Sequence, residues 1–480
     1  MTKKGARHSL GTTDAVEYAA QVEAAAAAAA AGAAAAAEAS GARTTSSLGS
    51  GDWLAGAGTT GEPEQVHVAL TGFPHALRVM WVTFGGAGAG AEAAWGTAPG
   101  VLAATARANA STYDVGILGG WHGTIHTVDM VFPSHLPPRT TVYYAVSGTC
   151  PTACWSPVFS VALPAAIGME TATTLALWGD MGTVIPDGWR VAADVAAAAR
   201  RADGAWNAMH IVGDLAYAGM GAHDAWQPIW DMFGRQMQDA AVQVPLMVSV
   251  GNHEEYYDFE AYVKRFSAPG AVLTPGANRH FWYSYEVGNI HVTSMSTEHP
   301  YLPGTPQYAW LAADLKAVDR RRTPWLVLVS HRPFLASDAF EHTAHIPGAP
   351  LVDSVGRLAA AAGVDLVVSG HCHVYERTLP TLPSGAVTSH GAANGTVFHA
   401  PGAPIWIVAG TGGAIYPDSW VVPIPPWSAV RIHKLGDDIV YGYGVVSTNA
   451  TALEWTLHRA AHSSYPGGPS HILDRFTLIR

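Results

Sequence analysis

Seven side chains in the middle of this sequence are of types that ligate metal ions, and each closely follows an apolar run. They are Asp180, Asp214, Tyr217, Asn252, His331, His371 and His373. Carboxylate, amide and imidazole ligands together suit zinc, manganese or iron, whereas a structural zinc knot would use thiolates. A carboxylate shared by two cations holds them about 3.5–4 Å apart, which suits in-line displacement at phosphorus. The residue types therefore predict a dinuclear metal centre for phosphoryl transfer.

Tyr217 discriminates best among the metals that such a centre could hold. A phenol with a pKa of about 10 is a poor ligand for divalent ions at neutral pH. A trivalent cation can displace the phenolic proton and bind the phenolate. Because Tyr217 lies three residues after Asp214, the pair points to ferric iron at one of two positions. The alternative is a tyrosine that packs beneath the loop and binds no metal.

Each motif taken alone also has a structural explanation. A Gly-Asp pair at a strand end is usually a turn, Asn252 with His253 could be a capped turn, and His331 could be a partly buried histidine with satisfied partners. The two histidines within 370–373 are a stronger signal. All five motifs occur in one chain and each ends an apolar run, which favours a metal centre over a set of coincidences. They lie at 179–182, 213–217, 251–254, 329–331 and 370–373.

The apolar runs before these motifs predict the strands that position them. Continuous apolar runs such as TTLALW, VPLMVSV and TPWLVLV are typical of strands buried on both faces. Helical patterns between the runs cover 189–201, 306–320 and 351–362. This alternation predicts a layered α/β fold with helices over a largely parallel sheet. In such sheets ligands collect outside the carboxyl ends of the strands, where the ligating residues lie.

The chain before this region has an all-β texture. Short runs rich in β-branched and aromatic residues lie at 66–70, 77–84, 112–117, 124–132 and 141–147, with Gly, Pro and Asn between them. They predict an immunoglobulin-like or fibronectin-like sandwich. We divide the chain into an Ala/Gly-rich low-complexity tail at 1–61, an N-terminal domain at 62–165 and a catalytic domain at 170–480, of which 403–480 is the C-terminal part.

Composition restricts the classes of function. A formal net charge of -11 argues against a nucleic-acid-binding surface, which needs a basic stripe. No apolar run is long enough to span a bilayer. The nearest, 24–37, is interrupted by Gly32 and preceded by acidic residues, so it is no clear signal peptide either. A presequence stays an alternative to the low-complexity tail.

The cysteines and glycosylation sequons do not decide whether the chain enters the secretory pathway. Cys150 and Cys154 could close a small loop as a disulfide or could remain two thiols. If they form the disulfide, Cys372 has no cysteine to pair with. Sequons begin at Asn109, Asn394 and Asn449. They matter only if the chain enters the secretory pathway.

The five motifs together resemble those of the purple acid phosphatases, in the calcineurin-like metallophosphoesterase superfamily. That family has GDxG, GDxxY, GNH(D/E), VxxH and GHxH, and this chain has GDMG, GDLAY, GNHE, LVSH and GHCH. The one departure is Leu328 in place of valine. Segments such as QVHVALTG, SHRPF and DRFTL resemble plant and algal members, and the likeness covers about residues 62–480. It implies a four-layer sandwich of two mixed β-sheets flanked by helices, preceded by a fibronectin type III-like domain.

The resemblance also implies roles for individual residues. Ferric iron would be bound by Asp180, Asp214, Tyr217 and His373, and zinc, manganese or ferrous iron by Asp214, Asn252, His331 and His371. Asp214 would bridge the two ions, and charge transfer from the tyrosinate would colour the protein purple. His253 would contact the phosphoryl group while a metal-bound hydroxide attacks a phosphate monoester, with an acid pH optimum.

Proton delivery to the leaving group stays open. Plant members often place histidine in the segment after the VxxH motif, and here it offers His342 and His345. The alternative is that both lie in a surface loop without a catalytic role. Glu298 and His299 are further residues expected to line the cleft.

Two other functions compete with the acid phosphatase hypothesis. One is another dinuclear metallophosphoesterase, such as a phosphodiesterase, a phytase or a protein phosphatase with two divalent ions. The other is an inactive metal-binding surface protein, against which the complete ligand set argues. By resemblance we expect a small phosphate-ester substrate and a secreted or vacuolar protein, and a homodimer stays open.

Overall fold

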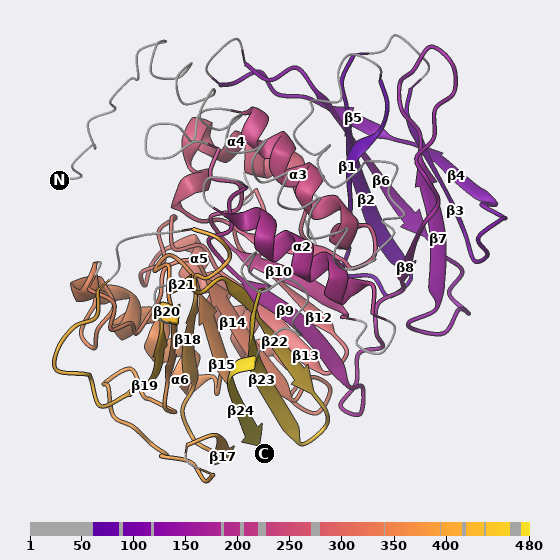
Figure 1. Cartoon of the computed structure of the whole chain (residues 1–480). Coiled ribbons are helices and arrows are strands. Elements are labelled where there is room, and N and C mark those ends of the chain that lie inside the picture. Colours follow the sequence, from indigo (N-terminus) through magenta and orange to yellow (C-terminus); the bar gives the residue numbers. More distant parts are fainter. Residues whose placement is uncertain are drawn as a thin grey trace, which may run out of the picture.

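The computed structural model describes residues 61–480, except 86–89, 117–119, 184–186, 202–205, 219–226, 270–278, 340, 394, 415–418, 436–437 and 461–471. The expected tail, apart from Gly61, and the sequon asparagine Asn394 therefore lie outside the described residues. Figure 1 shows a small all-β unit, coloured indigo to purple, beside a larger body of sheets and helices. This arrangement confirms the expected fold class.

The N-terminal unit consists of two four-stranded sheets with orders β1-β2-β6-β5 and β4-β3-β7-β8. All its neighbouring strands pair antiparallel. The strands are β1 Glu64–Leu70, β2 Ala76–Thr83, β3 Glu92–Gly96, β4 Ala104–Arg107, β5 Asn109–Ser111, β6 Thr124–Val131, β7 Thr141–Val146 and β8 Phe159–Ala162.

The prediction of a strand at 112–117 was wrong. The chain at 112–115 forms no strand, and pairing occurs earlier, in β4 and β5. Tyr113 stacks on Trp121 with ring centroids 4.4 Å apart, and its hydroxyl accepts a hydrogen bond from Arg265 Nε at 2.6 Å. The aromatic residue that suggested a strand therefore packs at the junction with the larger body.

The first large sheet has seven strands in the order β11-β10-β9-β22-β23-β24-β17. Strands β9, β10 and β11 are parallel, whereas β22, β23 and β24 continue from β9 in antiparallel fashion. The sheet is thus mixed, rather than largely parallel as the apolar runs suggested. Its strands are β9 Thr173–Trp178, β10 Ala208–Val212, β11 Leu246–Ser249, β17 Val397–His399, β22 Gly442–Thr448, β23 Ala452–Arg459 and β24 Ile472–Ile479.

The second large sheet also has seven strands, in the order β12-β13-β14-β15-β18-β16-β19. Its central strands β13, β14, β15 and β18 are parallel, and the strands at both edges are antiparallel. They are β12 Tyr283–Val287, β13 Ile290–Ser294, β14 Trp325–Ser330, β15 Leu366–Ser369, β16 Tyr375–Thr378, β18 Ile405–Ala409 and β19 Ser428–Ile432. A two-stranded sheet, β20 Lys434–Leu435 with β21 Asp438–Ile439, lies beyond them.

Helices cover the outer faces of both large sheets, which gives four layers (Figure 1). The first sheet carries α2 Gly188–Ala199, α3 Pro228–Ala241 and α4 Tyr256–Arg265, and the second carries α5 Pro306–Ala317, the π-helix η4 Val352–Gly356 and α6 Arg357–Ala361. Two 3-10 turns, η2 Asn252–Glu254 and η3 His342–Ala344, lie in the segments that follow β11 and β14. The three expected helical stretches are confirmed, whereas α3 and α4 were not foreseen.

Residue alternation along the strands explains the layering. In β9, Leu175 and Leu177 belong to the core between the sheets, and Ala176 and Trp178 pack toward α2 and α3. The residues of β14 divide in the same way between the central core and the layer of α5 and α6. Because successive side chains of a strand point to opposite faces, strands covered on both sides must be apolar throughout.

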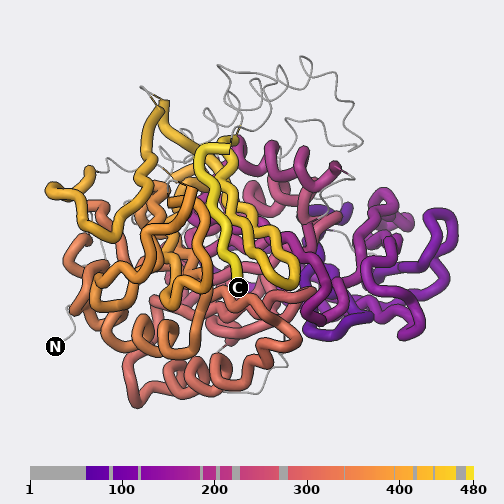
Figure 2. The backbone as a smooth tube through the Cα atoms, turned by 90° about the horizontal axis from the view of Figure 1, so that it is seen from below, coloured from indigo at the N-terminus to yellow at the C-terminus, as the bar shows by residue number. Residues whose placement is uncertain are grey.

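A buried polar network joins the two units. Arg235 Nη2 lies 2.7 Å from Glu64 Oε1, and Arg265 Nη2 lies 2.9 Å from Asp231 Oδ1. Trp121 Nε1 donates to the same aspartate at 3.0 Å. In Figure 2 the indigo N-terminal unit projects from one side of the body, and the yellow C-terminal strands lie between the magenta and orange parts.

The structure also bears on the predictions for the cysteines and the glycosylation sequons. Cys150 and Cys154 form a disulfide, which decides between the two alternatives left open, and Cys372 is a buried free thiol. Asn109 and Asn449 are exposed. Among the residues that the structure describes, no helix is long and apolar enough to cross a membrane.

Candidate metal centre

The predicted ligands meet where parallel strands of both large sheets end. Asp180, Asp214 and Asn252 follow β9, β10 and β11 of the first sheet, and His331 and His371 follow β14 and β15 of the second. Carboxyl ends of parallel strands lie at one edge of a sheet. The sandwich therefore brings five distant segments of the chain to one place.

Four of the predicted ligands have left-handed backbone conformations. The φ angles are 61° at Asp180, 51° at Asp214, 47° at Tyr217 and 70° at His371. Such conformations cost a non-glycine residue roughly 1–3 kcal/mol, and they persist where surrounding structure over-determines them, often at functional sites. Each turn re-aims a side chain from the end of its strand toward the space between the sheets.

Two glycines allow the turns to approach one another. A Cβ atom at Gly251 would collide with Oδ1 of Asp214, and one at Gly370 would collide with Oδ2 of Asp180. Any larger residue would therefore displace a carboxylate. This close approach is what the sequence predicted for the glycines that precede the ligands.

The first donor group surrounds the hydroxyl of Tyr217. This oxygen lies 3.3 Å from Asp180 Oδ1, 3.1 Å from Asp214 Oδ2 and 3.0 Å from His373 Nε2. His373 Nε2 is itself 3.5 Å from Asp180 Oδ1. These are the four residues that the resemblance assigns to ferric iron, and the structure brings all of them together.

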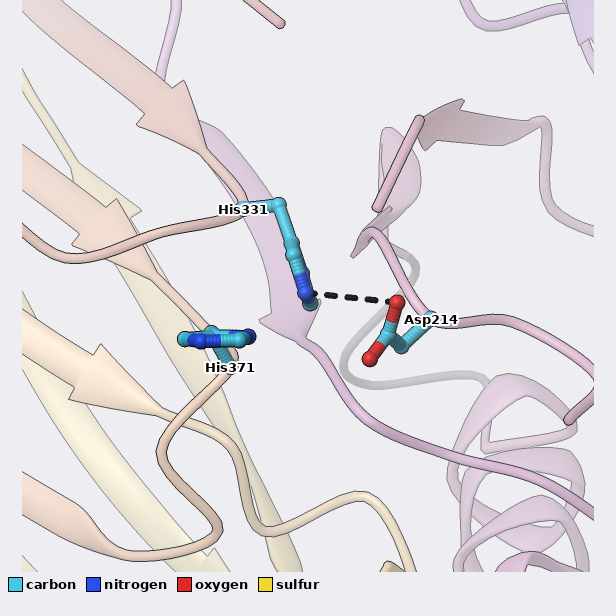
Figure 3. Close-up of side chains that lie close together, drawn as sticks. All are labelled: Asp214, His331 and His371. Atoms are coloured by element: carbon cyan, nitrogen blue, oxygen red, sulfur yellow. Dashed lines mark ion pairs between the residues drawn. The ribbon is translucent and has the colours of Figure 1, made fainter. Parts of the chain in front are cut away.

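The second donor group lies on the other side of Asp214. Asn252 Oδ1 is 3.0 Å from His331 Nε2 and 2.9 Å from His371 Nδ1, and His331 Nε2 is 3.2 Å from Asp214 Oδ1. Figure 3 shows the two imidazoles and the carboxylate pointing toward one another from opposite sides of the site. The residues assigned to the divalent ion thus also converge.

Asp214 belongs to both groups through different oxygens. Its Oδ2 faces Tyr217 and its Oδ1 faces His331. Ligand atoms of Asp214 with Asp180 and His373, and of Asp214 with His331 and His371, lie within 4.8 Å of one another. A carboxylate that directs one oxygen into each of two adjacent donor groups has the geometry of a bridge between two cations.

Burial and charge shift the pKa values of Tyr217 and Asp214 in opposite directions. Burial, followed by the charges of Asp214 and Asp180, raises the pKa of Tyr217 far above its ordinary value. Burial would also raise the pKa of Asp214, but attraction to His331 and His253 outweighs it and leaves that pKa below its usual range. A charged carboxylate therefore lies beside a neutral phenol, and a bound cation would favour the ionised form of both groups.

Glu254 holds the loops that carry the ligands. Its carboxylate accepts hydrogen bonds from the backbone N–H groups of Asp214 at 2.8 Å, Leu215 at 2.9 Å and Gly251 at 2.8 Å. His331 is oriented by its second ring nitrogen, which lies 3.0 Å from the carbonyl oxygen of Val212. Contacts of this kind fix ligand orientation around metal sites.

The three histidines expected to act on substrate have different surroundings. His253 is half-buried, its ring centroid lies 4.2 Å from that of Tyr217, and its Nε2 is 3.9 Å from Asp214 Oδ2. His345 is buried, 6.2 Å from His371 between ring centroids. His342 is half-buried in η3, where its Nδ1 lies 3.2 Å from the carbonyl of Ala336.

Sequence reasoning missed two residues beside the donor groups. Arg332 Nη1 lies 3.0 Å from His371 Nε2, and Glu341 Oε2 lies 3.2 Å from the same nitrogen. The only signal for Arg332 is its place directly after a ligating histidine, and Glu341 has none. Glu298, expected in the cleft, pairs with Arg332 at 2.9 Å, whereas His299 stacks on Phe281.

Comparisons with known proteins agree with this architecture. Three family models match in chain order: the Purple acid Phosphatase N-terminal domain at 63–162, the Calcineurin-like phosphoesterase at 174–375 and the Iron/zinc purple acid phosphatase-like protein C at 403–465. The chain is 31% identical over 412 residues to Purple acid phosphatase 18 of Arabidopsis thaliana, covering 83% of this chain and 81% of that protein. The chain belongs to the purple acid phosphatase family.

This purple acid phosphatase is therefore a phosphoesterase, as its motifs predicted. Its fold matches the solved purple acid phosphatase PPD1 from yellow lupin (Lupinus luteus) seeds with a TM-score of 0.73, 23% identity and coverage of 88% of this chain and 75% of that one. A Nucleotide pyrophosphatase/phosphodiesterase of Hordeum vulgare is 26% identical over 338 residues, covering 64% of this purple acid phosphatase and 88% of that protein.

Proposed function

We propose that this purple acid phosphatase hydrolyses phosphate monoesters at a dinuclear centre of ferric iron and one divalent ion. The observation that carries the proposal is the placement of Asp214, whose two oxygens face two different donor groups. Asp180, Tyr217 and His373 would complete the ferric position. Asn252, His331 and His371 would complete the position of zinc, manganese or ferrous iron.

The residues present suit these ions. A phenolate is a ligand for a hard trivalent cation, and the amide and imidazole donors suit a divalent one. When bound, the ions supply an activated water for attack at phosphorus and neutralise charge on the phosphoryl oxygens. The chain provides the shared carboxylate and a rigid rim of buried strand ends. His253, whose ring centroid lies 4.2 Å from that of Tyr217, would donate a hydrogen bond to a phosphoryl oxygen.

A Tyr217→Phe variant tests the ferric position. This change removes the phenolate oxygen and keeps the ring, so the purified variant should lack the visible absorption band that tyrosinate gives with ferric iron. Tyr144→Phe is a matched control, because Tyr144 is buried and its hydroxyl donates to the carbonyl of Val242 far from the site. A Tyr217→Phe protein that stayed purple would remove this residue from the iron site.

Proton delivery by His342 or His345 can be tested with two leaving groups. Burial lowers the pKa of His345 to about 4, and His342 contacts a backbone carbonyl outside both donor groups. We therefore expect His342→Asn and His345→Asn each to reduce kcat by less than about tenfold, for p-nitrophenyl phosphate and an alkyl phosphate alike. A loss of about 100-fold confined to the alkyl phosphate would instead identify a general acid.

The barley relative named for nucleotide pyrophosphatase and phosphodiesterase activity favours a phosphodiesterase as the second candidate function. Rates with p-nitrophenyl phosphate and bis(p-nitrophenyl) phosphate distinguish the two, and we expect the monoester to have the higher kcat/KM. Failure to hydrolyse either compound in the metal-loaded protein would support an inactive metal-binding protein.

A secreted or vacuolar location is part of the proposal. The disulfide between Cys150 and Cys154 supports it, since such bonds persist in oxidising compartments. Asn109 and Asn449 are exposed in sequons and are therefore accessible for glycosylation. Mass shifts at these asparagines after glycosidase treatment of the native protein would test the assignment.

A further inference from the structure

The two ring nitrogens of His371 face different environments. Nδ1 lies 2.9 Å from Asn252 Oδ1, inside the second donor group, whereas Nε2 lies 3.2 Å from Glu341 Oε2, outside it. If Nδ1 is the nitrogen that faces a cation, Nε2 carries the proton of the neutral ring. This N–H then donates to the carboxylate of Glu341, and the Arg332 guanidinium, which is always a donor, pairs with the same carboxylate rather than with Nε2. The carboxylate thereby favours the tautomer whose Nδ1 is free for a cation.

Glu341 is held in turn by a second ion pair. Arg332 Nη1 lies 2.9 Å from Glu341 Oε2. The other side of the same guanidinium is clamped by Glu298, with Nε 2.9 Å from Oε1 and Nη2 3.1 Å from Oε2. The Glu298 side chain is only 7% exposed, so burial restrains the pair that it forms with Arg332. A chain of charged contacts thus runs from Glu298 through Arg332 and Glu341 to His371.

These contacts do not form a third metal site. Ligand atoms of Glu341, His345 and His371 lie within 4.8 Å of one another, which by itself could suit a cation. However, Nη1 of Arg332 lies 3.0 Å from His371 Nε2. A guanidinium is always charged in proteins, and it already supplies the positive charge beside this carboxylate.

We propose that Glu341 is a positioning residue that orients His371 for the divalent ion alone. The inference rests on the proposed dinuclear centre and adds an asymmetry to it. The Glu341 side chain contacts the ring of His371 in the second donor group, whereas Asp180 and His373 in the ferric group contact the Tyr217 hydroxyl. Loss of the carboxylate should therefore weaken one metal position and spare the other.

The test compares metal content in full-length Glu341→Ala, Glu341→Gln and wild-type protein. After equilibration with a graded series of a divalent-ion chelator, iron and the second metal are counted per chain, and the visible spectrum is recorded. Removing an outer partner of a ligating histidine commonly weakens metal binding about 10–100-fold. We expect that loss of divalent-ion affinity in Glu341→Ala, an intermediate effect in Glu341→Gln, which keeps an acceptor oxygen, and unchanged iron and colour in both.

Asp353→Asn is the matched control. Its side chain is 42% exposed, close to the 43% of Glu341, and it also pairs with an arginine, Arg357, at 3.0 Å. The control should keep wild-type affinity for both metals. Wild-type divalent affinity in Glu341→Ala, or equal loss of iron and divalent ion, would overturn the positioning role. A wild-type protein that bound only iron would instead overturn the proposed dinuclear centre.

Discussion

An Asp214→Asn variant is expected to lose the second metal, bind iron weakly and hydrolyse an aryl phosphate roughly 1,000-fold more slowly than wild type, or worse. Asp214 directs one oxygen to Tyr217 and the other to His331, so an amide in its place cannot serve both donor groups as an anion. A metal ion supplies several kcal/mol of transition-state stabilisation, and each 1.4 kcal/mol corresponds to a factor of ten in rate. Metal counts per chain and kcat for p-nitrophenyl phosphate measure the effect.

Asp474→Asn separates loss of the bridge from a general effect of removing a buried carboxylate. Asp474 is buried in β24, and it accepts hydrogen bonds at 2.6 Å each from Tyr375 and Arg377 in β16. This variant should be less stable but should keep both metals and most of its activity once folded. Full metal content and activity in Asp214→Asn would exclude this residue as the bridge.

An Arg265→Ala variant should lower the free energy of unfolding by about 3–5 kcal/mol, because it leaves a buried charge without its partner. Arg265 pairs with Asp231 at 2.9 Å and donates to Tyr113 at 2.6 Å and Gln65 at 3.0 Å. Its guanidinium also lies 4.4 Å from the centroid of the Trp121 ring. Three of these partners come from the N-terminal unit, so the loss should also loosen the junction between the units.

Denaturant unfolding under fixed metal concentration measures this effect, since bound metal stabilises the folded state. Arg357→Ala removes an exposed ion pair with Asp353, in which the arginine side chain is 63% exposed. That control should cost about 0–1 kcal/mol. Equal, small losses in the two variants would show that the buried network contributes little to stability.

The convergence of the candidate ligands could be predicted from the sequence because each follows a buried strand. Asp180, Asp214, Asn252, His331 and His371 lie after five apolar runs, and in a layered fold the carboxyl ends of such runs are where binding sites form. The structure brings these residues together as expected. The metals themselves remain a prediction, since they depend on chemistry that side-chain positions support but do not identify.

Strand direction could not be predicted in the same way. Burial on both faces produces a continuous apolar run whether a strand is parallel or antiparallel to its neighbour. Strand β22 is buried along nearly its whole length, as β9 is, although the two strands are antiparallel.

Helix α4 and the contact between Glu341 and His371 could not be predicted for other reasons. Helix α4 has only 10 residues, and Tyr257, Asp258 and Phe259 interrupt it with left-handed backbone angles. Glu341 reaches His371 only through the path of the loop after β14. No spacing rule relates two residues that are 30 positions apart and meet through tertiary structure.

Elemental analysis of the natively purified protein, combined with its visible spectrum, tests the central claim most directly. The account predicts two metal ions per chain, of which one is iron, and a visible band that disappears in parallel with phosphatase activity when the metals are removed. A metal-free chain that still hydrolysed phosphate esters at the full rate would contradict it.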